Sequence, residues 1–136
     1  MIARGHGRLT VRAEYRRVGA DLLVTISGGD RPHIGAAALA GPDAPPAAVT
    51  LAGHRETQLA LEAAEHLRGI LLGAVLVSCG IHVDDADREQ IRILCENTRE
   101  LIGALAEELS REGPAPLPGT GTPISSSEEA DTLGIQ

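Results

Sequence analysis

The pattern that most constrains this chain is an apolar stripe between residues 91 and 109, which recurs every three or four residues. Such a stripe predicts an amphipathic helix with one face packed on a core. Asp87 with Gln90 three residues later predicts a capping box at the start of the helix, and Gly113-Pro114 predicts its end. The stripe consists of Ile91, Leu94, Cys95, Thr98, Leu101, Ile102, Leu105 and Leu109.

The residues before the first helical pattern are typical of strands. Residues 9–16 alternate between apolar and polar side chains, which predicts a strand with one face in a core and one in water. A second strand is predicted over residues 21–27 and a third, made of small residues, over residues 33–40. Residues 41–46 (Gly-Pro-Asp-Ala-Pro-Pro) predict a rigid, exposed connector. A short strand is expected over residues 48–51.

The remaining elements complete a two-layer fold. Residues 53–56 open a helix whose apolar face contains Leu59, Ala63, Leu67 and Ile70, and residues 72–79 form a continuous apolar run that predicts a buried strand. Three strands, a helix, a strand and a helix predict an α+β sandwich, with a mainly antiparallel sheet and two helices on one face. The other sheet face, including residues 12, 14 and 16, is then left in water or against a second subunit.

Length and composition set further limits. A chain of 136 residues favours one domain, which we assign to residues 1–112. Residues 113–136 are rich in Pro, Gly, Ser and acidic residues and are predicted to be a disordered tail. The net charge of −7 makes nucleic acid an unexpected partner. All 12 basic residues are Arg, so no Lys can act as a base or form a Schiff base. Tyr15 is the only aromatic residue, so ring stacking on a ligand is limited.

The cysteines and the apolar runs indicate a cytoplasmic protein without a membrane anchor. The N-terminus has no apolar run of the kind found in a secretory signal. The longest apolar run, residues 70–77, is too short to span a bilayer. We therefore expect Cys79 and Cys95 to be reduced thiols and not a disulfide.

Three loops carry the polar residues that most suggest a binding site. Residues 27–35 (Ser-Gly-Gly-Asp-Arg-Pro-His-Ile-Gly) join two predicted strands, residues 53–56 (Gly-His-Arg-Glu) open the first helix, and residues 80–86 precede the second. Backbone N–H groups of Gly-rich loops and of helix N-termini are natural sites for anions. If the three loops meet at one edge of the sheet, they form a pocket for a small anionic ligand, such as one bearing a phosphate.

Other interpretations of the same residues stay open. Residues 27–35 also fit an irregular turn without function, and the polar side chains of the other two loops fit helix capping and loop hydrogen bonds. A zinc site would use His33, His54, His82 and Asp84, although no two of these lie at the spacing of a common zinc motif. A thiol nucleophile would use Cys79 with His82, but Cys79 ends a buried strand and is expected to be an inert core thiol.

The three loops together resemble those of a known family. Residues 24–36 (Val-Thr-Ile-Ser-Gly-Gly-Asp-Arg-Pro-His-Ile-Gly-Ala), residues 53–56 and residues 80–84 (Gly-Ile-His-Val-Asp) are similar in order and spacing to motifs of the prenylated-flavin chaperones, typified by the small D subunit of gallate decarboxylase (LpdD-like). The resemblance spans about residues 8–110. The chain departs from the family at residues 85–88, where Asp-Ala-Asp-Arg replaces Asn-Ala-Thr-Pro and preserves the helix cap.

This resemblance implies a fold like that of the proteasome-assembly chaperones, a tendency to form homodimers, and no catalytic activity. It also implies binding of prenylated FMN, or FMN, and its delivery to a UbiD-type (de)carboxylase. The alternatives are a protein-only assembly chaperone or non-catalytic decarboxylase subunit, and a small metal-dependent enzyme. The cofactor-binding residues that the resemblance implies are Gly28, Gly29, Arg31, Pro32, His33, Gly35, His54, Arg55, Glu56, His82 and Asp84.

Overall fold

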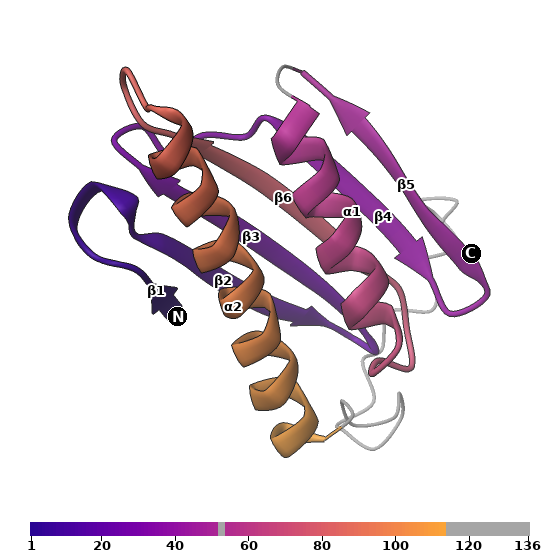
Figure 1. Cartoon of the computed structure of the whole chain (residues 1–136). Coiled ribbons are helices and arrows are strands. Elements are labelled where there is room, and N and C mark those ends of the chain that lie inside the picture. Colours follow the sequence, from indigo (N-terminus) through magenta and orange to yellow (C-terminus); the bar gives the residue numbers. More distant parts are fainter. Residues whose placement is uncertain (52–53, 114–136) are drawn as a thin grey trace, which may run out of the picture.

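The computed structural model describes residues 1–51 and 54–113, which form one sheet covered on one face by two helices (Figure 1). This confirms the predicted two-layer α+β sandwich. The strands are β1 (Ile2–Arg4), β2 (Val11–Val18), β3 (Asp21–Gly29), β4 (Ala36–Gly41), β5 (Ala44–Thr50) and β6 (Val75–His82); the helices are α1 (His54–Arg68) and α2 (Arg88–Glu112), with a short 3₁₀ turn, η1 (Gly7–Leu9), before β2. The predicted tail lies outside the described residues, apart from Gly113.

The sheet has six strands in the order β1-β2-β3-β6-β4-β5. Only β3 and β6 run parallel, and every other neighbouring pair is antiparallel. Because β3 and β4 flank β6 on opposite sides, residues 30–35 must cross the C-terminal end of β6. The N–H groups of Asp30 and Arg31 donate to the carbonyl of His82 at 2.7 and 3.2 Å, and Gly35 N–H donates to the carbonyl of Cys79 at 3.0 Å.

Two parts of the sheet differ from the sequence prediction. The described chain has five strands before α1 where the sequence predicts three and a short fourth, because β1 was not expected and β5 is longer than the strand predicted at 48–51. The connector predicted at 41–46 is present but shorter: only residues 42 and 43 lie between β4 and β5, and Pro45 and Pro46 lie within β5. This strand is at the edge of the sheet, where a residue without an N–H group can be accommodated.

Three boundaries are also displaced. The strand predicted at 72–79 is β6, which begins and ends three residues later, so Gly80 and His82 belong to the strand and not to a loop. The third predicted strand begins at Ala36 instead of His33. Helix α1 ends at Arg68, which places Ile70 beyond it with 41% of its surface exposed.

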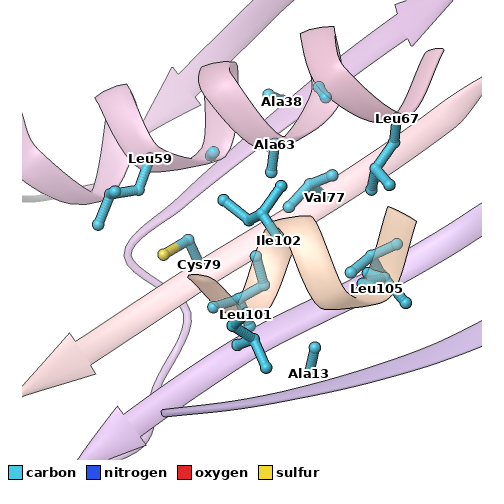
Figure 2. Close-up of a cluster of buried hydrophobic side chains, with 14 of the residues drawn as sticks. Ala13, Ala38, Leu59, Ala63, Leu67, Val77, Cys79, Leu101, Ile102 and Leu105 are labelled. Atoms are coloured by element: carbon cyan, nitrogen blue, oxygen red, sulfur yellow. The ribbon is translucent and has the colours of Figure 1, made fainter. Parts of the chain in front are cut away.

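The core is aliphatic and sits between the sheet and the helices. In Figure 2, side chains of α1 and α2 meet above Val77 and Cys79 of β6. The small residues of β4 face α1, whose Ala60, Ala63 and Ala64 are fully buried. The small strand therefore leaves space for a helix to pack closely. The largest fully buried side chains are Ile26, Leu67, Leu101, Leu105, Val11, Val24, Val75, Val77, Thr98 and Cys79.

Helix α2 is capped as the sequence predicts. The side chain of Asp87 accepts from Gln90 N–H at 2.7 Å, and the side chain of Gln90 accepts from Asp87 N–H at 3.0 Å. At the other end, Gly113 adopts a positive φ of 77° and its N–H donates to the carbonyl of Leu109 at 3.1 Å. Within the described residues, no helix is both long and apolar enough to cross a bilayer.

Replacing Leu101 by Ala tests the aliphatic core. Leu101 of α2 is fully buried, so Leu101→Ala leaves a cavity and is expected to lower the free energy of unfolding by about 2–5 kcal/mol. Chemical denaturation measures the change. Leu72→Ala is the control, because Leu72 is 67% exposed and its loss should cost little. A decrease below about 1 kcal/mol for Leu101→Ala would contradict this packing.

Candidate functional site

The three loops singled out in the sequence meet at the end of the molecule where β6 ends and both helices begin. The crossing segment, residues 30–35, brings His33 to the first turn of α1, and residues 80–86 connect β6 to α2. Figure 1 shows that α1 and α2 run side by side with their N-termini at the same end. The predicted meeting of the three loops at one edge of the sheet is therefore correct.

A cavity of about 490 Å³ lies between these elements. Its walls are apolar where Leu59 of α1 and Ile91 and Leu94 of α2 line it, and polar where His33, Arg55 and Glu56 line it. The apolar lining residues are Leu59, Ile81, Val83, Ala86, Ile91, Leu94 and Cys95, and the polar ones are His33, Arg55, Glu56, His82 and Asp85. A cavity of this size and character suits a small organic ligand with a charged end.

His33 and Glu56 form the central polar contact of the cavity wall. His33 Nε2 lies 3.0 Å from Glu56 Oε1, and His33 Nδ1 lies 2.9 Å from the carbonyl oxygen of Arg31. Both ring nitrogens of His33 therefore face an oxygen atom within the protein. Glu56 Oε1 also accepts from Ile81 N–H at 3.1 Å, and the Glu56 side chain is only 13% exposed. One carboxyl group thus joins α1, β6 and the crossing segment.

Gly35 and Gly80 allow the crossing segment to lie close to β6 and α1. A Cβ atom at Gly35 would lie 1.6 Å from Glu56 Oε2, and a Cβ atom at Gly80 would lie 1.7 Å from the carbonyl oxygen of His33. Neither position can carry a side chain without moving the His33–Glu56 contact. Their role is therefore to let the crossing segment lie against β6 and α1.

A second polar cluster fixes the outside of the crossing segment. Arg8 donates through Nη2 to Asp30 Oδ2 at 2.7 Å, and Asp84 N–H donates to the same oxygen at 2.9 Å. The Arg8 hydrogen bond, followed by that from Asp84 N–H, holds the pKa of the Asp30 carboxyl below its ordinary value. Asp84 in turn contacts His82 Nε2 at 3.1 Å and Arg31 Nη2 at 3.2 Å.

Arg55 is the cationic residue of the cavity that is free to meet a ligand. It lies in the first turn of α1, it is exposed, and its guanidinium forms no ion pair or hydrogen bond with a described residue. The N-termini of α1 and α2 both face this end of the molecule, so their dipoles also favour an anion there. An anionic group would be stabilised next to Arg55.

The residues expected to bind a cofactor fall into two groups. His33, Arg55, Glu56 and His82 line the cavity. The others do not line it: Gly28, Gly29 and Gly35 are sites of close backbone approach, Arg31 and Asp84 form an exposed ion pair, and Pro32 lies in the crossing segment. The side chain of His54 lies outside the described residues.

Sequence reasoning missed the apolar wall. Ile91, Leu94 and Cys95 were assigned to the core stripe of α2, and Leu59 to the apolar face of α1. Leu59 and Leu94 do belong to the core, but all four residues also line the cavity. Ile91 and Cys95 remain partly exposed, whereas Leu101 and Leu105 further along the same stripe are fully buried. Periodicity places all of them on one helix face but does not show what lies opposite.

The positions of the described residues do not favour a thiol nucleophile or a metal site. Cys79 is buried, and desolvation, with a smaller contribution from Glu56, raises its pKa to about 12, so its thiol stays protonated near neutral pH. The expected position of Cys79 in the core is confirmed. Cys79 and Cys95 are both free. Among the residues that the structure describes, no group of three or more His, Cys, Asp or Glu side chains could hold a metal ion.

The Asp30 cluster predicts a change of stability with pH. Because the pKa of Asp30 is lowered in the folded state, its stabilisation is complete above the unfolded value of about 4 and is lost as the pH falls through the folded value. Asp30→Asn is therefore expected to destabilise the protein at pH 6, and the difference from the wild type should shrink at pH 3. Urea denaturation at the two pH values measures this.

Asp43→Asn is the matched control, since Asp43 lies in the β4–β5 turn and forms no ion pair or hydrogen bond with a described residue. It should change stability little at either pH. A difference between Asp30→Asn and the wild type that is as large at pH 3 as at pH 6 would show that the carboxylate charge is not what stabilises the cluster.

Comparison with known proteins agrees with the motifs of the three loops. No curated protein matches the chain. A family model described as the prenylated flavin chaperone LpdD-like domain matches residues 5–110. The match extends from just before η1 into the last turns of α2, and it includes all three loops and every residue that lines the cavity. The chain therefore belongs to the prenylated flavin chaperone family, of the LpdD-like kind.

Proposed function

We propose that this protein binds prenylated FMN in the cavity between α1 and α2 and delivers it to a UbiD-type (de)carboxylase. The observation that carries the proposal is the division of the cavity into an apolar wall and a polar mouth, where the Arg55 guanidinium is unpaired among the described residues. Prenylated FMN has the same division, because an apolar prenylated ring system is joined to a phosphate dianion.

The described residues fit such a ligand in size and chemistry. A volume of about 490 Å³ is within the roughly 300–1,000 Å³ of small-molecule sites. The ring system would lie among aliphatic side chains such as Leu59, Ile91 and Leu94, and the phosphate would lie near Arg55 and the two helix N-termini. None of the described lining residues is Phe, Trp or Tyr, because the single Tyr of the chain, Tyr15, is hydrogen-bonded to Glu108 near the other end of α2. Binding without aromatic stacking favours release, which a carrier requires.

Several features support a carrier without catalytic activity. The thiol of Cys79 is protonated, the chain contains no Lys, and both ring nitrogens of His33 are occupied by contacts within the protein. Most polar groups of the cavity therefore hold the protein in shape. We also propose that the protein acts in the reducing cytoplasm, since the thiols of Cys79 and Cys95 are free.

Replacing Arg55 by Ala tests the site and the position of the phosphate. Arg55→Ala is expected to weaken binding of FMN about 10-fold or more, because a charge-assisted hydrogen bond is worth about 1.5–3 kcal/mol. Binding of riboflavin, which lacks the phosphate, should change little. Fluorescence titration of wild-type protein and variant with both ligands measures the four dissociation constants.

Arg111→Ala is the matched control, because it removes the same charge from an exposed position in the last turn of α2. It should leave both affinities unchanged. An equal loss of FMN and riboflavin binding in Arg55→Ala would contradict a phosphate contact, and the absence of flavin binding to the folded wild type would contradict the proposed site.

Transfer to an enzyme tests delivery. The chain loaded with prenylated FMN is expected to activate a UbiD-type apo-decarboxylase faster than the same concentration of free prenylated FMN, because the carrier shields the apolar ring system from water. Decarboxylase activity against time gives the two rates. Equal rates, or slower activation by the loaded chain, would argue against a delivery role even if the chain binds the cofactor.

A further inference from the structure

The face of the sheet opposite the helices is free of any described residue that could cover it. Both helices pack on the other face, as Figure 1 shows. Large apolar side chains are exposed on the free face: Leu23 is 36% exposed, Leu76 is 38%, Leu39 is 57% and Val49 is 73%. They come from β3, β6, β4 and β5, so the apolar surface crosses four neighbouring strands. A contiguous apolar surface of this kind marks an interaction site.

The strand register arranges this face in two rows that run across the sheet. The residues of each row lie side by side on successive strands, and the rows are two residues apart along each strand. The first row is Arg16, Leu23, Leu76, Leu39 and Ala47 on β2, β3, β6, β4 and β5. The second row is Glu14, Thr25, Ser78, Ala37 and Val49 on the same strands.

The two rows are complementary to each other position by position. The first row has leucines on the three central strands, and the second row has Thr25, Ser78 and Ala37 there. On β5 the order is reversed, because the small Ala47 is in the first row and the larger Val49 is in the second. On β2 the first row has Arg16 and the second has Glu14, and neither forms an ion pair with a described residue.

We propose that this face binds a second copy of the chain, with a two-fold axis that runs across the strands between the two rows. Such an axis places the first row of each copy over the second row of the other. The leucines then pack on small residues, and Arg16 of each copy faces Glu14 of the other. Isologous interfaces require this kind of self-complementarity.

The size of the face reaches the lower limit of specific protein interfaces. Five strands spaced about 4.8 Å apart and about six residues long, at about 3.3 Å per residue, cover roughly 480 Å² in projection. Two copies would therefore bury about 1,000 Å² of flat surface, an area at the lower limit for a specific interface. The protruding side chains add to this area. Two twisted sheets pack face to face with their strands within about 30° of each other, so the rows remain opposed near the axis. The charged pairs on β2 lie at the rim, as in most protein interfaces.

The pattern favours a second copy over an unrelated partner. A different protein would need only an apolar patch, and nothing would relate the two rows. Here each large side chain of one row corresponds to a smaller one in the other row, and the positive charge of Arg16 corresponds to the negative charge of Glu14. This inference does not depend on the flavin proposal, because the face lies on the opposite side of the sheet from the cavity walls formed by α1 and α2.

Charge reversal followed by charge exchange tests the arrangement. Sedimentation equilibrium of the full chain at micromolar concentration is expected to give twice the mass of one chain. Arg16→Glu places a new carboxylate opposite Glu14 twice in each dimer and should weaken dimerisation about 10-fold or more. The double variant Glu14→Arg/Arg16→Glu restores opposite charges and should recover most of the wild-type affinity.

Leu76→Arg introduces two charges at the centre of the interface and should give a monomer. The control Leu72→Arg makes the same change at a position that is 67% exposed, between α1 and β6 and outside both rows, and it should remain a dimer. Circular dichroism shows whether each variant is folded. A monomeric wild type, a dimer unaffected by Leu76→Arg, or a double variant as weak as Arg16→Glu would overturn the proposal.

Discussion

The crossing of residues 30–35 over the end of β6 is the constraint on which the site depends. β3 runs parallel to β6 and β4 runs antiparallel to it, so the chain must turn around the end of β6 between them. Backbone N–H groups of the segment donate to the carbonyls of His82 and Cys79, which satisfies polar groups at the strand end that would otherwise need other partners. Gly35 and Gly80 make the approach sterically possible. The same crossing carries His33 to Glu56 and so fixes the polar wall of the cavity.

The division of tasks among the polar residues is consistent with the proposed carrier, which must hold a ligand and then release it. Asp30, Arg8 and Asp84 bind one another on the outside of the crossing segment, and Glu56 binds His33 and Ile81 N–H inside it. These groups are satisfied within the protein and maintain its shape. Arg55 is left for an anion, and aliphatic side chains of the two helices are left for an apolar group. A rigid frame with few ligand-directed contacts suits a carrier more than an enzyme.

The sequence predicted those parts of the fold whose signals are local. The capping box of α2, its stripe and the alternation of β2 all depend on neighbouring residues, and all were correct. The meeting of the three loops was also predicted correctly, because each of their motifs lies at the end of a strand or the start of a helix. Pro45 and Pro46 suggested a connector because the sequence does not show that their strand lies at an edge of the sheet. Ile91 and Cys95 looked like core residues because periodicity does not show that a cavity lies opposite them. In both places the missing information is tertiary.

Production of the chain together with a flavin prenyltransferase, followed by native mass spectrometry of the purified protein, tests the central claim most directly. If the cavity between α1 and α2 is a site for prenylated FMN, each chain will carry the additional mass of one molecule, and denaturation will release it. A folded chain that retains only its own mass, when the prenyltransferase is active in the same cells, would contradict the assignment of this cavity to the prenylated cofactor.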